Sequence, residues 1–200
     1  MGPVATPGPA EPEAAAPQPV AHIWPSDALA REMVKKAIRA LSAKSIDPSV
    51  SALLACYFMT SSPNPGSILK IFDELDAEFR ANDYTYECED DEKNDRCKRV
   101  PDSSTMAKAA HGYTWGTFLG AITQAHIHLC MNTVSGQDND CVASTIIHEM
   151  SHRYEGTEDH AYCNFCDEQE CPKELSASDA LDNADSFSAF AYKLWRITLT

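Results

Sequence analysis

Two histidines and a glutamate in the last third of the chain place the strongest constraint on its fold. His148, Glu149 and His152 form the pattern H-E-x-x-H. In an α-helix, positions i and i+4 lie one turn apart on the same face, so both imidazoles can bind one zinc ion. Glu149 then lies beside the metal, where a carboxylate can accept a proton. We therefore expect a helix over residues 142–154 that is built around a metal site.

The turn after this helix offers several third ligands. Gly156 follows the motif, and glycine is typical of the position at which a helix ends and the chain reverses. A catalytic zinc has three protein ligands and an open position for water, whereas four protein ligands close a structural zinc. Because a structural site needs no proton acceptor, Glu149 favours an enzyme over a non-catalytic binding domain stabilised by zinc or disulfides. The candidates for the third ligand are Glu155, Glu158, Asp159 and His160.

The composition argues against some classes of partner. The 200 residues suit one domain with or without a tail, and the 44% hydrophobic share is sufficient for a core. A formal net charge of -14 is unsuited to binding the phosphates of a nucleic acid or an anionic membrane. It is compatible with substrates that carry positive charge. The sequence also has no apolar run long enough to span a bilayer.

Eight cysteines indicate an oxidising compartment, and we expect a secreted protein with disulfides. The sequence does not determine the pairing. The N-terminus lacks a basic start followed by an apolar block, so we expect either that a leader was removed or that export follows another route. Cys163, Cys166 and Cys171 have the spacing of a second, structural zinc site, but a fourth ligand would have to come from far away. Disulfides are the preferred interpretation of this cluster.

Hydrophobic spacing predicts a mainly helical domain with a few strands. Residues 1–25 are rich in Pro and Ala and are predicted to be a disordered tail or linker, followed by one domain over residues 26–200. Ser26 or Asp27 is expected to cap the first helix. The apolar stretch 50–59 is either helical or extended. The predicted helices span residues 26–41, 68–79 and 142–154, and a last one runs from Ser176 or Ser178 to Trp195. The predicted strands span residues 84–88, 112–118 and 125–131.

Two further histidines, His126 and His128, alternate along the last predicted strand and therefore share one of its faces. They have the chemistry of metal ligands, but a polar strand face is the preferred interpretation.

Two short stretches carry a resemblance to a known family. Residues Gly156 to Tyr162 read G-T-E-D-H-A-Y, which resembles the G-T-x-D-x-x-Y-G signature of the aspzincin metallopeptidases, the family of deuterolysin and peptidyl-Lys metalloendopeptidase. Asn183 to Ser186 read N-A-D-S, as in the same family. The resemblance extends from about Ala28 to Tyr192, with the specific motifs in the last third. The final Gly of the signature is Cys163 here.

The resemblance implies roles for individual residues. His148, His152 and Asp159 would bind one catalytic Zn²⁺, and Glu149 would be the general base. Tyr162 would donate a hydrogen bond from its hydroxyl to the oxyanion of the tetrahedral intermediate. Asp185 would line an acidic pocket that binds Lys after the cleaved bond. Ser188 stands where the Lys-specific members have a Glu, so the preference for Lys is expected to be weak, with Asp182 as an additional carboxylate.

The resemblance also implies an α+β, zincin-like fold, with helices packed on a small mixed sheet and the active-site helix behind an edge strand. Residues 125–131 are the candidate for that strand, which would bind substrate as an added strand. The implied activity is that of a zinc-dependent metalloendopeptidase, acting on protein or peptide substrates through zinc-activated water. We expect a monomer. The alternatives are the non-catalytic domain described above and the same protease domain delivered as a toxin effector.

Overall fold

The computed structural model describes residues 20–59, 65–89, 112–113, 125–130, 134, 136–162 and 175–197. Several features predicted from the sequence lie outside these ranges. They are residues 1–19 of the tail, residues 114–118 and 131 of two strands, and the cluster Cys163, Cys166 and Cys171. The division into a tail over residues 1–25 and a domain over residues 26–200 stays a prediction.

Helix α1 (Val20–Leu41) begins earlier than predicted. The expected cap at Ser26 or Asp27 is wrong, because both residues lie inside the helix and are buried. The carboxylate of Asp27 accepts hydrogen bonds from the hydroxyls of Tyr84 at 2.6 Å and Tyr86 at 2.7 Å. Asp27 therefore attaches α1 to the first strand instead of capping the helix.

Helix α2 (Pro48–Tyr57) shows that the apolar stretch 50–59 is helical rather than extended up to residue 57. The carboxylate of Asp47 accepts a hydrogen bond from the backbone N–H of Ser49 at 2.7 Å. Pro48 stands at the start of the helix, where its missing N–H removes no intrahelical hydrogen bond. This capped start favours the helix over a strand.

Helix α3 (Pro65–Ala81) confirms the amphipathic helix predicted over residues 68–79. Its buried residues follow helical spacing, and among them the ring centroid of Phe72 lies 5.8 Å from that of Phe187 and 5.9 Å from that of Phe190. Aromatic pairs at these distances stabilise a fold by more than the burial of their apolar surface alone. Phe72 therefore fixes α3 against the C-terminal helix.

The helix predicted between Ser176 or Ser178 and Trp195 is two helices, α6 (Ala177–Leu181) and α7 (Ala184–Arg196). The prediction of one helix is wrong because Asn183 adopts an extended backbone, with φ −104° and ψ 116°. Asn183 forms a parallel β-bridge with Glu158, a residue distant in the sequence. Helical periodicity within residues 176–195 carries no sign of this bridge.

The sheet has three strands in the order β1-β3-β2. Strand β3 (Ala125–Cys130) pairs in parallel with β1 (Tyr84–Glu89) and antiparallel with β2 (Gly112–Tyr113). These pairings confirm strands in all three predicted places. The prediction that residues 125–131 form an edge strand is wrong: β3 is central, and Ile127 and Leu129 are fully buried. Among the described strands, the antiparallel edge is β2.

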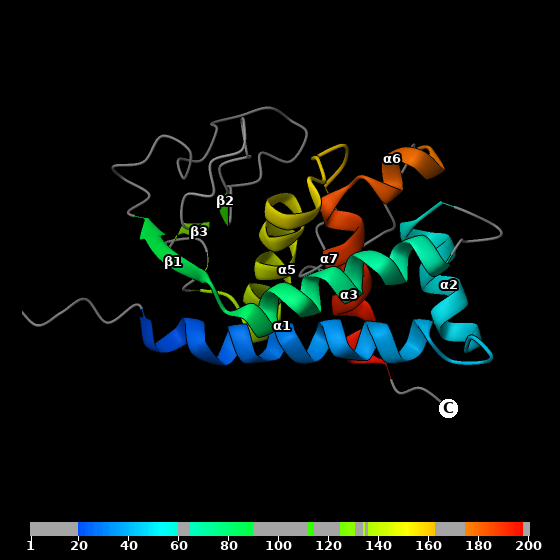
Figure 1. Ribbon diagram of the computed structural model, residues 1–200, viewed down its shortest axis with the longest axis horizontal. Helices are drawn as coiled ribbons and strands as arrows, with labels where there is room; N and C mark the ends of the chain where they lie inside the picture. The colour runs from blue at the N-terminus through cyan, green and yellow to red at the C-terminus, as the bar shows by residue number, and fades with distance from the viewer. Residues whose placement is uncertain are drawn as a thin grey trace, which may run out of the picture.

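The helices pack together beside this sheet, which confirms the expected α+β fold (Figure 1). Helix α1 runs along one side of the molecule, and α5 (Asn139–Glu155) and α7 lie side by side across it (Figure 1). Helices α5 and α7 run in opposite directions, so the C-terminal end of α5 and the N-terminal end of α7 meet at the same end of the pair (Figure 1). The largest side chains of the shared core are Tyr57, Phe58, Phe72, Phe79, Phe187, Phe190 and Tyr192.

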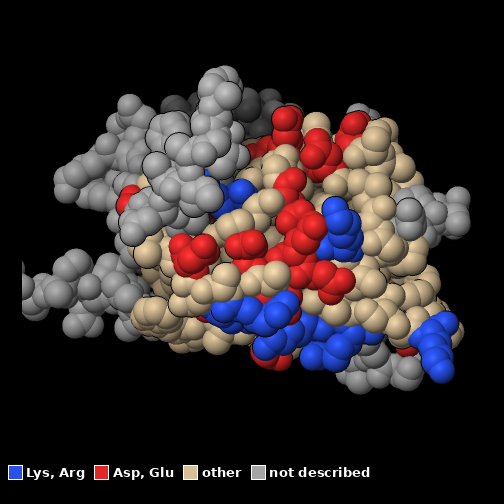
Figure 2. All heavy atoms as spheres, in the orientation of Figure 1, with Lys and Arg blue, Asp and Glu red and all other residues tan. Residues whose placement is uncertain are grey.

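The surface is charged and unevenly patterned. On the face that Figure 2 shows, Lys and Arg gather along α1, and Asp and Glu lie above them. No helix within the described ranges combines the length and hydrophobicity needed to cross a bilayer.

Candidate metal centre

The motif helix α5 ends as the sequence predicted. Gly156 caps it with a left-handed backbone, φ 68° and ψ 23°, a conformation that glycine adopts without steric cost. His148 and His152 lie one turn apart, and their Nε2 atoms are 3.0 Å from each other. The turn at Gly156 then directs the following residues back over this face of the helix.

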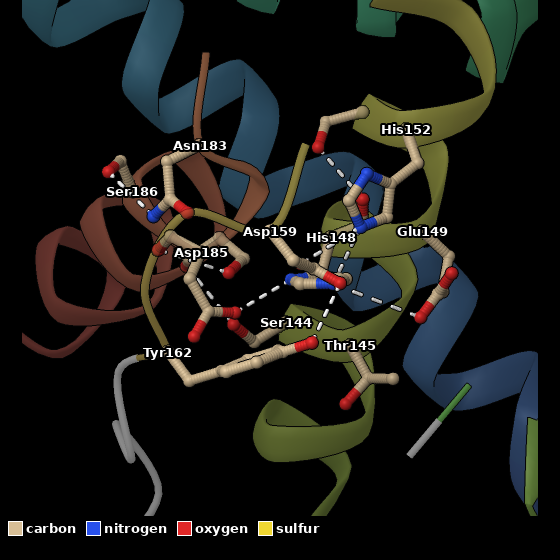
Figure 3. Close-up of polar contacts among 12 residues, drawn as sticks. Ser144, Thr145, His148, Glu149, His152, Asp159, Tyr162, Asn183, Asp185 and Ser186 are labelled. Atoms are coloured by element: carbon tan, nitrogen blue, oxygen red, sulfur yellow. Dashed lines mark hydrogen bonds and ion pairs between the residues drawn. The ribbon is translucent and has the colours of Figure 1, made fainter. Parts of the chain in front are cut away.

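Asp159 is the candidate third ligand that reaches the two imidazoles. Its Oδ1 lies 3.3 Å from the Nε2 of His148 and 3.2 Å from the Nε2 of His152 (Figure 3). The other three candidates have different partners. Glu155 shares a hydrogen bond with Glu74, and Glu158 and His160 belong to an exposed group with Asp182.

The geometry and chemistry of these three residues fit zinc. Donors placed tetrahedrally at about 2.0–2.1 Å from zinc lie roughly 3.3 Å from one another. The three separations between Nε2, Nε2 and Oδ1 are 3.0, 3.2 and 3.3 Å. Two imidazoles and one carboxylate are also a ligand set found in catalytic zinc sites.

Each histidine has a hydrogen-bond acceptor on the far side of its ring. His148 donates from Nδ1 to Oδ1 of Asp185 at 2.7 Å, and His152 donates from Nδ1 to the carbonyl oxygen of Thr157 at 2.5 Å. With Nδ1 carrying the proton, the lone pair of each ring is on Nε2. Both rings are therefore held in the tautomer that a metal ligand requires.

Asp185 lies in α7 behind His148, and it is only 4% exposed. The family resemblance implied that it is a substrate-binding residue, and that role stays a prediction. Its contact with His148 was missed, because nothing in the sequence links two residues 37 positions apart. A carboxylate that supports a metal-bound histidine is a common arrangement, but its position becomes known only from the fold.

Glu149 is 3% exposed and lies beside the cluster, with Oε1 4.0 Å from the Nε2 of His148 (Figure 3). Its buried Oε2 has no hydrogen-bond partner among the described residues, and such orphaned oxygens are uncommon in a core. Burial raises the pKa of Glu149 to about 7, against the opposing effects of His148 and His152. Glu149 is thus a carboxyl with an unused acceptor beside the converging ligands.

The charged groups of the cluster shift the pKa values of their neighbours. Burial acts to raise the pKa of Asp159, but hydrogen bonds with His148 and His152 outweigh it and hold this pKa well below its usual range. Burial acts to lower the pKa of His148, but its contacts with Asp159 and Asp185 raise this pKa well above its usual range. Without a bound cation, these contacts therefore favour a proton on Nε2 of His148 beside an ionised Asp159, and a metal ion that binds here would replace that proton.

Tyr162 reaches the same cluster from the surface. Its side chain is exposed, and its hydroxyl donates to Oδ2 of Asp159 at 2.8 Å. The other oxygen of this carboxylate, Oδ1, is the one that lies near the two histidines. Burial of the hydroxyl, followed by the hydrogen bond to Asp159, raises the pKa of Tyr162 well above its usual range, so the hydroxyl keeps its proton.

Two residues considered for the substrate pocket, Ser188 and Asp182, lie in different environments. Ser188 is buried, and its hydroxyl donates to the backbone carbonyl of Asp185 at 3.3 Å. Asp182 is on the surface, with Oδ2 3.0 Å from the Nε2 of His160. His160 therefore contacts Asp182 rather than supporting a ligand of the cluster.

The histidines of the last strand lie apart from this cluster. His128 is buried, and its Nδ1 lies 3.2 Å from Oε2 of Glu87 on the neighbouring strand. It belongs to neither of the metal-capable groups found among the described residues. The side chain of His126 is outside the described part of the chain.

Comparison with known proteins identifies a family and a solved structure with a similar fold. A model of the aspzincin family, described as lysine-specific metallo-endopeptidase, matches residues 43–192. A solved zinc peptidase from Grifola frondosa matches the fold with a TM-score of 0.62 at 16% sequence identity, and the match covers 92% of this chain and 100% of that chain. At this level of identity the likeness concerns the fold. No curated protein matches the chain.

Proposed function

Because this chain belongs to the aspzincin family of zinc metalloendopeptidases, we propose that His148, His152 and Asp159 bind its catalytic zinc. The observation that carries this proposal is the convergence of two imidazole nitrogens and one carboxylate oxygen within 3.3 Å of one another. Three protein ligands leave one tetrahedral position open, which is typical of a catalytic rather than a structural zinc.

Glu149 is proposed as the general base. Zinc, when bound, supplies a Lewis acid that lowers the pKa of water and polarises a carbonyl group. Glu149 accepts a proton from the attacking water and later passes it to the leaving amine, with no covalent intermediate. Its burial beside His148 supports this role, as does its Oε2, which has no hydrogen-bond partner in the described part of the chain. A carboxyl with a pKa near the working pH is suited to both steps.

Tyr162 is proposed to donate a hydrogen bond from its hydroxyl to the oxyanion of the tetrahedral intermediate. Two observations support this role. The hydroxyl is hydrogen-bonded to Asp159, a member of the cluster, and its surroundings keep it protonated. To reach a substrate oxygen, the hydroxyl must leave Oδ2 of Asp159. The exposed position of Tyr162 is compatible with this exchange of partners.

The proposed substrates are proteins or peptides, with a weak preference for Lys or another basic residue after the cleaved bond. A net charge of -14 favours basic peptides over acidic ones. Asp185 is the proposed pocket carboxylate, but one of its oxygens is bound to His148, and the buried hydroxyl of Ser188 adds no charge. A single carboxylate that is already bound to His148 is expected to favour basic side chains over others only weakly. The free edge that a substrate strand needs is proposed to be that of β2, the antiparallel edge among the described strands.

Digestion of a denatured protein mixture, with and without a metal chelator, tests this function. We expect cleavage that the chelator abolishes and that added zinc restores. Mapping of the cut sites is expected to show a modest enrichment of Lys and Arg after the cleaved bond. Cleavage that persists after complete removal of zinc would contradict the proposal, and an even distribution of cut sites would contradict the basic preference alone.

Replacing Asp185 with Asn is expected to lower zinc affinity by about 10- to 100-fold, the usual effect of removing a partner of a metal-bound histidine. The amide keeps the size of the side chain but loses the charge that holds His148. Competition with a chromophoric chelator measures the affinity, and Asp182→Asn, two residues outside α7, is the matched control. Equal affinity in the two variants would show that Asp185 does not support the ligand.

We also propose that the protein is secreted, monomeric and disulfide-bonded. The eight cysteines support an oxidising compartment, where thiols pair as disulfides. Peptide mapping without reduction would identify the pairs, and a protein with all eight thiols free would contradict the proposal.

A further inference from the structure

The side chain of Asn183 lies beneath the segment that carries Asp159. It is fully buried, and its Oδ1 accepts hydrogen bonds from the backbone N–H groups of His160 and Ala161, each at 3.0 Å. Its Nδ2 donates to the hydroxyl of Ser186 at 3.1 Å. The two backbone N–H groups need an acceptor, and the hydroxyl of Ser186 accepts from a donor. A side-chain amide supplies both the acceptor and the donor.

The backbone strengthens this attachment. The N–H of Glu158 donates to the carbonyl of Asp182 at 2.7 Å, and the N–H of Ala184 donates to the carbonyl of Glu158 at 3.0 Å. Residues 158, 160 and 161 are therefore all bound to the short stretch at the start of α7. Asp159 lies between these attached residues, so its direction depends on them.

The same stretch also holds a second ligand. Two residues after Asn183, the carboxylate of Asp185 binds the Nδ1 of His148. Asn183 and Asp185 thus connect the start of α7 to the segments of two proposed ligands, one in α5 and one in the turn that follows α5, and Figure 3 shows both residues beside the cluster. Both segments therefore contact the same short stretch of the chain.

We propose that Asn183 is a positioning residue, which holds Asp159 at the distance from His148 that zinc coordination requires. The inference rests on the proposed function, because it takes these residues as the zinc ligands. Loss of the amide leaves two backbone N–H groups without their acceptor. The segment that carries Asp159 and Tyr162 is then free to move away from α5.

Three variants of the full chain test this inference. Asn183→Ala removes both sides of the amide, and Asn183→Asp keeps an acceptor for the two N–H groups. Leu54→Ala removes a buried side chain of α2 outside the site and controls for general destabilisation. Amide hydrogen exchange of His160 and Ala161, measured by NMR on the metal-free protein, reports the hydrogen bonds directly. Zinc affinity and the visible absorption spectrum of the cobalt-loaded protein report the coordination.

For Asn183→Ala we expect faster exchange at both amides, zinc affinity lower by about 10- to 100-fold and an altered cobalt spectrum. Asn183→Asp is expected to recover the slow exchange and most of the affinity, and Leu54→Ala to change neither. Unchanged exchange in Asn183→Ala, or a loss of affinity no greater than that of Leu54→Ala, would overturn the inference. Failure of the unmodified protein to bind zinc would instead contradict the proposed function, whatever the exchange rates.

Discussion

Replacing Glu149 with Gln is expected to leave zinc bound but to lower the rate of peptide cleavage by about 10²- to 10⁴-fold. Glutamine has nearly the same shape as glutamate, so the packing around this buried position is retained. It cannot accept and then return a proton, which is the role proposed for Glu149. Zinc is retained because the converging atoms belong to His148, His152 and Asp159.

Glu155→Gln is the matched control for this variant. Glu155 is the last residue of the same helix, and its carboxyl contacts Glu74 rather than the cluster. The measurements are zinc content by mass spectrometry and initial rates on a quenched fluorescent peptide. Activity of Glu149→Gln within tenfold of the unmodified protein would contradict the assignment of the general base. Loss of zinc would show instead that Glu149 takes part in binding the metal.

The second large effect is expected for Asp159→Ala, which removes the proposed third ligand. Zinc affinity should fall by about 100-fold or more, because a direct ligand contributes at least as much as the outer partners whose loss costs 10- to 100-fold. The two histidines would also lose the carboxylate that lies 3.2 and 3.3 Å from their Nε2 atoms. Activity should disappear with the metal.

Glu158→Ala provides the comparison, since this neighbouring side chain is exposed and lies outside the three-residue cluster. Titration of the metal-free protein with zinc measures both affinities. If Asp159→Ala bound zinc as tightly as Glu158→Ala, the third ligand would have to be another residue.

The geometry of the H-E-x-x-H helix was predictable because it depends only on residues close together in the sequence. His148 and His152 share a helix face through their spacing alone, and Gly156 ends that helix as its position in the sequence suggests. The choice of Asp159 as the proposed third ligand needed the family resemblance, because spacing alone left four candidates. The structure brings Asp159 to the histidines and leaves the other three with partners elsewhere.

The parts that sequence patterns missed depend on contacts between distant segments. Asp27 looks like a helix cap by its position, but its carboxylate binds Tyr84 and Tyr86. Asn183 interrupts a stretch with helical periodicity because it pairs with Glu158. Asp185 supports His148 across 37 positions. In each case a polar side chain or backbone group finds its partner only after the chain has folded.

The order of the strands was missed for a related reason. Alternation in the sequence predicts that a strand exists, but not which neighbours it has. Ile127 and Leu129 are buried in β3, which lies between two other strands, so this apolar stretch is central and not at the edge.

Anomalous diffraction at the zinc absorption edge, measured on crystals of the zinc-loaded protein, tests the central claim most directly. The predicted result is one strong peak between the Nε2 atoms of His148 and His152 and a carboxylate oxygen of Asp159, with no fourth protein ligand. A peak elsewhere, or a fourth side chain that closes the coordination sphere, would contradict the assignment of this cluster as the catalytic zinc site.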